Sequence, residues 1–167
     1  LETAILEALE AGTGVLGETR GGGSFRAVPT MRSIEADGKR AEFVGSQMID
    51  TWDIRLTGTL LEITPENMKD ALVCADMTTT GNKTTVKIRR DIKTEDYIPS
   101  LCWVGDTARG FVAIELTNAL NTAGANFTFT DKGEGTLPFE FVAHQADLKG
   151  GEYLPVRVIF FDEGEGA

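Results

Sequence analysis

The stretch from Ile49 to Leu72 constrains the fold of this chain more than any other part of it. Its first half alternates, because Trp52, Ile54 and Leu56 are separated by single polar residues. A period of two is typical of a β-strand that is buried on one face. We therefore expect a strand here, with these three side chains buried.

A glycine and then a helix start follow this alternation. The apolar phase shifts after Gly58, which predicts a β-bulge at the glycine and a buried face that continues at Leu61 and Ile63. Thr64 can cap a helix and Pro65 suits its first position. Apolar residues then recur at helical spacing at Met68, Ala71, Leu72 and Ala75. The sequence predicts a long bent strand that runs directly into one short helix near residues 65–75.

Shorter alternating stretches predict further strands and a mainly β domain. They lie near residues 24–35, 41–45, 84–90, 101–104, 111–116, 126–130, 137–141 and 153–161. Val86 and Ile88 are expected to point inward. The stretch 111–116 is apolar on both faces except for Glu115, so we expect it in a covered, central position. The stretch 153–161 is also apolar on both faces, which promotes aggregation unless something covers it.

The ends of the chain differ in composition from its middle. Residues 1–23 combine a possible short helix over 1–10 with a glycine-rich linker, which predicts an N-terminal arm. Residues 24–161 form the β domain, and residues 162–167 form an acidic tail. The Gly-x-Gly-x-x-Gly pattern at 12–17 follows a helix-like run instead of a strand. We therefore interpret it as part of the arm and not as a dinucleotide site.

The charge of the chain is acidic overall, with one basic stretch. The formal net charge is −10, which argues against a surface that grips nucleic acid. The acids concentrate towards the two ends, whereas five basic residues gather in the middle, at Lys83, Lys87, Arg89, Arg90 and Lys93. We expect this basic stretch to contact the acidic arm or tail of another copy of the chain.

No residue pattern in the chain is typical of an enzyme. His144 is the single histidine, and Cys74 and Cys102 are far apart, so the sequence has no metal-ligand spacing. Cys74 or Ser100 could form a nucleophile pair with His144, although no nucleophile motif surrounds them. We therefore expect no catalytic residue, metal or cofactor, and Trp52 and Trp103 as core or interface anchors.

Several segments together resemble a known family. The similarity is centred on Trp52 to Leu72, with Leu61-Glu62-Ile63-Thr64-Pro65-Glu66-Asn67, and extends upstream to Gly21-Gly22-Gly23-Ser24-Phe25, Ile34-Glu35, Asp37-Gly38 and Ile49-Asp50. It continues into the closing strands and so covers roughly residues 15–161. In order and spacing this set resembles the major tail proteins, or tail tube proteins, of long-tailed bacteriophages.

The resemblance implies a fold and a function. The implied fold is two packed β-sheets, like a sandwich or barrel, flanked by one short α-helix. The implied function is that of a structural virion protein that forms stacked hexameric rings, and so the tail tube that delivers DNA. Partners would be further copies of the chain, a tape-measure protein and a tail terminator protein, with no membrane. DNA would pass through the lumen without specific binding, and the protein would occur in the virion tail and, before assembly, in the host cytoplasm.

An acidic lumen would suit this role because it repels the phosphate groups of the DNA, which must slide through the tube without binding to its wall. The candidate lumen acids, on the exposed faces of core strands, are Asp53, Glu115 and Glu140. Two alternatives remain open from the sequence. One is the inner tube of a type VI secretion-like or other contractile system, and the other is a monomeric β-sandwich that binds a ligand.

Overall fold

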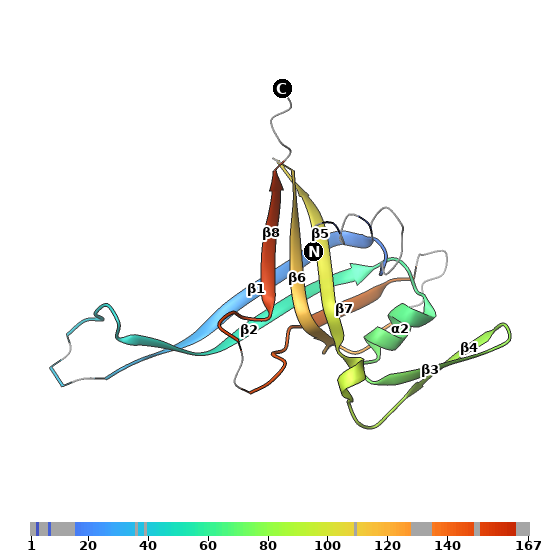
Figure 1. Cartoon of the computed structure of the whole chain (residues 1–167), viewed down its shortest axis with the longest axis horizontal. Coiled ribbons are helices and arrows are strands. Elements are labelled where there is room, and N and C mark those ends of the chain that lie inside the picture. The colour runs from blue at the N-terminus through green and yellow to red at the C-terminus, as the bar shows by residue number, and fades with distance from the viewer. Residues whose placement is uncertain are drawn as a thin grey trace.

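The computed structural model describes residues 16–35, 37–38, 40–108, 110–127, 135–148 and 151–162, together with residues 3 and 7. Figure 1 shows a mainly β molecule with one short α-helix. In chain order the elements are β1 (Thr19–Ser33), β2 (Gln47–Leu60), α2 (Pro65–Ala71), β3 (Ala75–Thr80), β4 (Lys83–Ile88), the 3₁₀ turn η1 (Thr94–Asp96), β5 (Ile98–Thr107), β6 (Gly110–Asn121), β7 (Leu137–Val142) and β8 (Val156–Asp162).

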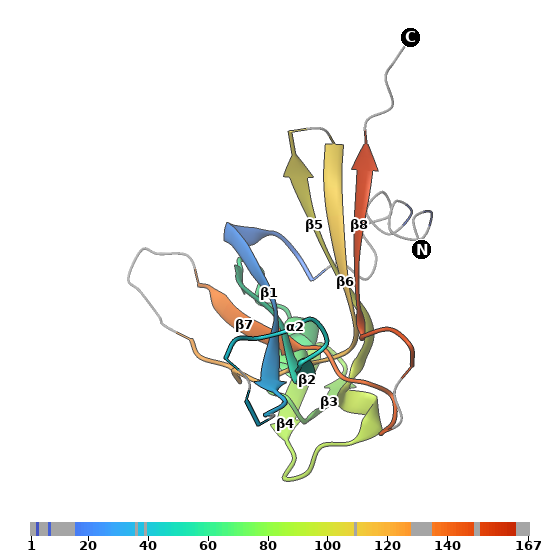
Figure 2. The same ribbon diagram turned by 90° about the vertical axis from the view of Figure 1, so that its left-hand side faces the viewer.

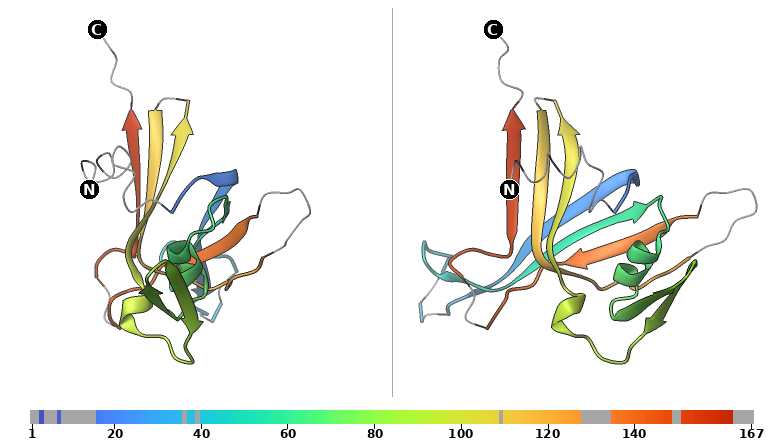
Figure 3. Two further views of the ribbon diagram at one scale, coloured as in Figure 1. Left: turned by 90° about the vertical axis from the view of Figure 1, so that its right-hand side faces the viewer. Right: turned by 45° about the vertical axis from the view of Figure 1, so that its right-hand side comes forward.

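The strands form one large antiparallel sheet and one small one. The large sheet has the order β1-β2-β7-β6-β5, and β8 also pairs with β6. The strands β3 and β4 form a separate hairpin beside α2 (Figure 3). In Figure 1, β5, β6 and β8 stand upright together while β1, β2 and β7 run obliquely across them, and Figure 2 shows the two groups of strands from another side. The large sheet thus bends into two layers, which confirms the expected two packed β layers flanked by one short helix.

The hydrophobic core lies between these two layers. One layer contributes Leu56, Leu60, Leu137, Phe139 and Phe141, and the other contributes Leu101, Ile114, Leu116 and Ala119, while Ala71 closes the core from α2. Three of the β6 residues, at 113, 116 and 119, have no exposed surface. The prediction of a covered, central strand over 111–116 is therefore confirmed.

The strand β6 changes partners along its length, and Asn118 lies at the change. Before this residue β6 pairs with β8, up to Leu116, and after it β6 pairs with β7, from Leu120. Asn118 has a φ of 48°, which few residues other than glycine and asparagine adopt easily. Its side-chain amide donates to the carbonyl of His144, 3.2 Å away. This left-handed residue lets one strand serve both layers.

The helix α2 begins as the sequence predicts and ends earlier. The Thr64 hydroxyl accepts a hydrogen bond from the backbone N–H of Asn67, and Pro65 occupies the first turn. The buried Asn67 side chain donates to the carbonyls of Leu16 and Glu62, so the helix holds the start of β1 in place. The helix ends at Ala71 and not near residue 75.

The predicted bulge at Gly58 is wrong. The pairing of β2 with β7 runs without a shift from Arg55 to Leu60, and Leu60 is buried while Ile63 is 44% exposed. The pairing of β1 with β2 is instead irregular at two places, between Thr19 and Gly23 and between Thr30 and Met31. A Cβ atom at Gly58 would lie 2.7 Å from Cζ of Phe139, so the glycine makes room for an aromatic ring.

Three other expectations from the sequence are wrong. Trp52 is 39% exposed instead of buried, because its part of β2 extends beyond the core. Residues 41–45 form no strand, since Glu42 accepts hydrogen bonds from Ser33 and Ser46 within the connection between β1 and β2. Ile88, expected to point inward, is 67% exposed.

Some predictions concern residues outside the described part of the chain. Within the expected helix over 1–10 only residues 3 and 7 are described, and both have helical backbone. Residues 128–130 of the expected strand over 126–130 and residues 163–167 of the acidic tail are not described. Residues 126 and 127 are not in a strand.

Candidate assembly surface

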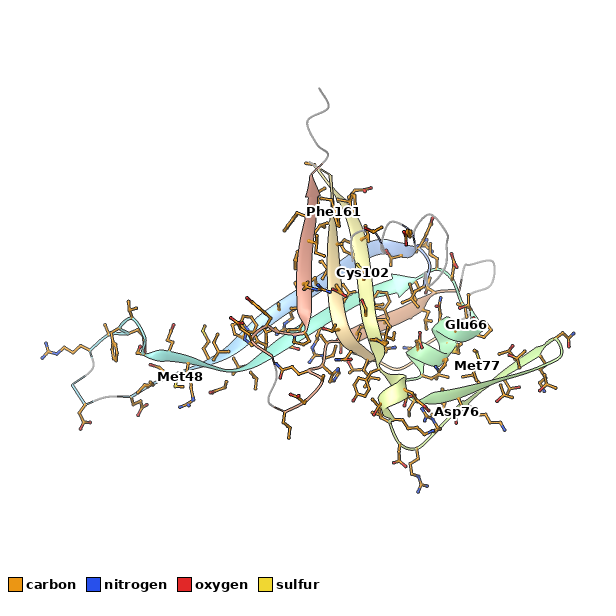
Figure 4. The ribbon with its side chains drawn as sticks, viewed as in Figure 1. Met48, Glu66, Asp76, Met77, Cys102 and Phe161 are labelled. Carbon is orange, nitrogen blue, oxygen red and sulfur yellow. The ribbon has the colours of Figure 1, made fainter. Side chains whose placement is uncertain are left out.

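The hairpin of β1 and β2 extends well beyond the body of the molecule (Figure 1). Because β2 pairs with β7 only from Arg55 onward, residues 28–33 and 47–52 are paired with each other alone among the described strands. We call these residues, with their connection 34–46, the projecting ribbon. Figure 4 shows Met48 on this ribbon, far from the helix and the small sheet. Eight large apolar side chains of the ribbon are exposed: Val28, Met31, Ile34, Phe43, Val44, Met48, Ile49 and Trp52.

The strands of the projecting ribbon have one apolar face, and their other face mixes polar residues with Val28 and Met48, which pair with Asp53 and Arg32. Pro29 pairs with Trp52 on the same side of the ribbon as the core residue Ile54. The register then shifts between Thr30 and Met31, so Ile49 pairs with Met31 and also lies on this side. We call these four residues, at 29, 31, 49 and 52, the apolar ribbon face. Ile54 is 3% exposed, whereas Ile49 is 51% and Met31 is 55% exposed. The apolar layer of the core therefore continues into the ribbon, where it has no cover.

The opposite face of the same strands carries a network of charges. Arg55 lies between two carboxylates, and its guanidinium contacts Asp53 and, at 2.7 Å, Glu140. Arg26 reaches Asp53 at 3.5 Å from β1, and the Thr122 hydroxyl donates to Glu140 at 2.8 Å. These charged side chains, with Ser24 and Thr57, line a depression of about 380 Å³.

The positive and negative charges of this network cancel, and Arg55 stays protonated within it. The hydrogen bond to Asp53, then the charges of Asp53 and Glu140, raise the pKa of the Arg55 guanidinium, so it stays charged. Two arginines face two carboxylates, and each charge has an opposite neighbour. The structure thus brings together two of the candidate lumen acids, Asp53 and Glu140, but pairs them with arginine. Such a surface offers neither a strong anion site nor a strongly acidic wall.

The third candidate lumen acid, Glu115, lies elsewhere. Its side chain, on β6, is 3% exposed, and it accepts hydrogen bonds from Ser100 and Arg157, both at 2.7 Å. A buried carboxylate is stable when it is paired and hydrogen-bonded in this way. Glu115 therefore joins β5, β6 and β8 and does not share a surface with Asp53 and Glu140.

The basic stretch from Lys83 to Lys93 is not uniformly available for contacts. Lys83, Lys87 and Arg90 are exposed on or after β4. Lys93 pairs with Glu95 at 3.2 Å. The side chain of Arg89 is only 14% exposed and is surrounded by Asp76, Glu95 and Asp96.

Arg89 has a structural position and not a contact position. Its carbonyl accepts from the Cys74 thiol and its backbone N–H donates to the Cys74 carbonyl, at the base of the β3–β4 hairpin. Together with the pairing to Asp76 on β3, this holds the hairpin against the chain around η1. Figure 4 shows Asp76 on the side of β3 away from α2, with Met77 on the side of the helix. Arg89 therefore leaves the set of residues available for contact with another copy.

Two further groups of large apolar side chains are exposed outside the ribbon. One lies around the small sheet and consists of Ile63, Met77, Ile88 and Ile92. The other lies in and before β8, and we call it the C-terminal apolar group: Leu148, Tyr153, Val158 and Phe160. Val158 is 45% exposed and Phe160 is 71% exposed. In the described part of the chain, β8 pairs only with β6.

The residues considered for catalysis have other partners. The Ser100 hydroxyl donates to Glu115, and the Cys74 thiol donates to a backbone carbonyl. The His144 ring lies 3.2 Å from the Asn118 carbonyl and contacts Tyr97 edge-on. Burial, and then the charge of Glu115, raise the pKa of the Cys102 thiol, which disfavours the reactive thiolate. Among the described residues, no group of histidine, cysteine and carboxylate side chains could hold a metal ion.

Sequence reasoning missed the apolar ribbon face and the two arginines of the charge network. The alternation around Trp52 was visible, but alternation shows only that one face is apolar and not what covers it. Arg26 and Arg55 lie directly opposite each other in the pairing of β1 and β2. A prediction of that register from the polar residues of the two strands could have found them.

Comparisons with protein families, with curated proteins and with solved structures find no match for this chain. No helix among the described residues is long and apolar enough to cross a membrane. The fold and the surface therefore define a mainly β protein with an uncovered amphipathic ribbon, and its function must be inferred from that surface.

Proposed function

We propose that this chain is a structural protein that polymerises with copies of itself. The observation that carries the proposal is the projecting ribbon, whose apolar face continues the core and is uncovered. A single chain gains nothing by holding such a face in water, since exposed contiguous apolar surface favours aggregation. The same face stabilises an assembly when it lies on an apolar surface of a neighbouring copy.

The form of the assembly follows from the sequence resemblance. We propose stacked hexameric rings that form a phage tail tube, with a tape-measure protein and a tail terminator protein as further partners and DNA as cargo. The amphipathic ribbon suits a tube wall, because its apolar face can lie between copies while its polar face is exposed to a water-filled lumen. The network of Arg26, Arg55, Asp53 and Glu140 would then give that part of the lumen a balanced charge, in place of the acidic lining expected from the sequence.

The proposal is tested by the oligomeric state of the purified protein. Light scattering coupled to size exclusion, followed by negative-stain imaging, should show rings or tubes at increasing concentration. A monomer at the highest concentration reached would refute self-assembly and favour the monomeric ligand-binding sandwich. A tube that excludes DNA and carries protein cargo would instead favour the secretion-like inner tube.

A matched pair of variants links assembly to the ribbon. Met31→Asp with Ile49→Asp places two charges directly opposite each other on the apolar ribbon face. Thr30→Asp with Thr51→Asp does the same on the polar face, with the same repulsion between strands. We expect the first pair to abolish assembly and the second pair to retain it, with unchanged circular dichroism in both. Equal assembly by both pairs would remove the apolar face from the interface.

A further inference from the structure

Among the described strands, β8 is an edge strand that exposes large apolar side chains. One of its faces carries Val158 and Phe160, which are 45% and 71% exposed, and the other carries Ile159 and Phe161. Its arginine, Arg157, is 61% exposed and pairs with the buried Glu115. Natural edge strands are normally short, charged or covered. Apart from Arg157, residues 156–161 of this strand are apolar on both faces, and among the described strands only β6 pairs with it.

The exposed side of β8 belongs to the same apolar layer as the core. Val158 pairs with Ile114, and Phe160 pairs with Val112, two β6 residues that lie in or against the core. The apolar ribbon face likewise continues the opposite layer of the core, next to Ile54. The molecule therefore exposes one half of a two-layer packing at the ribbon and the other half at β8. Neither half covers the other within one copy, because both remain exposed.

We propose that the apolar ribbon face of one copy packs on the C-terminal apolar group of the next copy. This inference rests on the proposed self-assembly and specifies the two surfaces that meet. The contact would continue the two-layer core from copy to copy, since each ribbon would supply the layer that β8 lacks. The two surfaces differ, so the contact is heterologous and each copy uses both surfaces once. Such a contact forms a ring when the rotation between copies closes.

The small sheet is a weaker acceptor for the ribbon. Its exposed apolar residues are less accessible on average than those of the C-terminal apolar group, and Met77, at 37%, is partly covered. The other face of the hairpin alternates Asp76 and Lys87 with threonines, so it has no apolar layer to continue. Met77 therefore supplies a control position with similar exposure to Val158.

The test is disulfide cross-linking between two different variants of the full chain. All proteins carry Cys102→Ser, and Cys74 is buried. A protein with Met31→Cys is mixed with an affinity-tagged protein that has Val158→Cys, under mild oxidation at an assembling concentration. We expect at least ten times more of the mixed dimer than with a tagged Met77→Cys partner. We also expect little homodimer of either variant alone.

Imaging of the same samples separates the possible failures. If rings or tubes form but position 31 cross-links equally to positions 158 and 77, the proposed pair of surfaces is overturned and self-assembly remains supported. The same holds if Met31→Cys homodimers are the main product. Absence of both assembly and mixed dimer would overturn this inference and the proposed function together. Phe160→Asp provides a second measurement, since it should lower the mixed dimer at least tenfold while circular dichroism remains unchanged.

Discussion

Two isoleucines of β2, five residues apart, separate the folding role of this strand from its assembly role. Ile54 is 3% exposed in the core, and Ile49 is 51% exposed on the projecting ribbon. Both can be truncated to alanine, which removes the same atoms from the same strand. We expect Ile54→Ala to impair folding and Ile49→Ala to impair assembly.

The magnitudes follow from the burial of each side chain. Removing a buried isoleucine side chain costs about 2–5 kcal/mol of unfolding free energy, so Ile54→Ala should lie in that range. Ile49 has about half of its surface in water in the isolated copy, so its truncation should cost less than about 1 kcal/mol there. Burying that half in an assembly contributes about 1 kcal/mol of binding free energy, which corresponds to a roughly fivefold change in the affinity of each contact.

Two assays measure these quantities separately. Denaturant unfolding at a concentration too low for assembly gives the stability of the single copy. Light scattering against concentration gives the concentration at which assembly begins, which should rise at least fivefold for Ile49→Ala. If Ile49→Ala lost as much unfolding free energy as Ile54→Ala and left the onset of assembly unchanged, the ribbon face would be part of the folded core and the reasoning would be refuted.

Three further predictions concern the fold itself. Gly58→Ala should cost about 1–3 kcal/mol in denaturant unfolding, because the new Cβ would displace the Phe139 ring; an unchanged midpoint would contradict this packing. Asn118→Val should be less stable than Asn118→Gly by at least about 1 kcal/mol, because valine is strained at a φ of 48°; equal stability would exclude that strain. Burial raises the pKa of Asp70, so the folded state binds that proton more tightly and loses stability as pH rises through the two pKa values. Asp70→Asn should therefore raise the melting temperature at pH 7, and the gain should vanish at acidic pH; a gain independent of pH would point to another cause.

The short-range features of the chain could be predicted from its sequence. Thr64 and Pro65 form the helix start because capping depends on neighbouring residues alone. The strand β7 has Leu137, Phe139 and Phe141 buried, as its alternation indicates. The central position of β6 could also be predicted, because a strand that is apolar on both faces is typical of a covered position in a sheet.

The candidate sites were less predictable, because they depend on which strands are neighbours. Asp53 lies two residues from Arg55 on β2, whereas Glu140 is far away in the chain and reaches Arg55 through the pairing of β2 with β7. Arg89 belongs to the most basic stretch of the sequence, yet its acidic neighbours in space include Asp76, on another strand. Net charge along the chain therefore did not describe the charge of either surface.

The amino-acid sequence alone determined the class of fold, because the period of two along most segments is typical of β-strands. Only the tertiary structure decided which apolar sides are covered. A strict period of two would put Ile49 and Ile54 on opposite sides of β2, but the pairing with β1 shifts between Thr30 and Met31, so both lie on the same side. The difference in their exposure arises because the second layer of the sheet ends near Ile54, so the strand beyond it has an apolar face without a partner in its own chain.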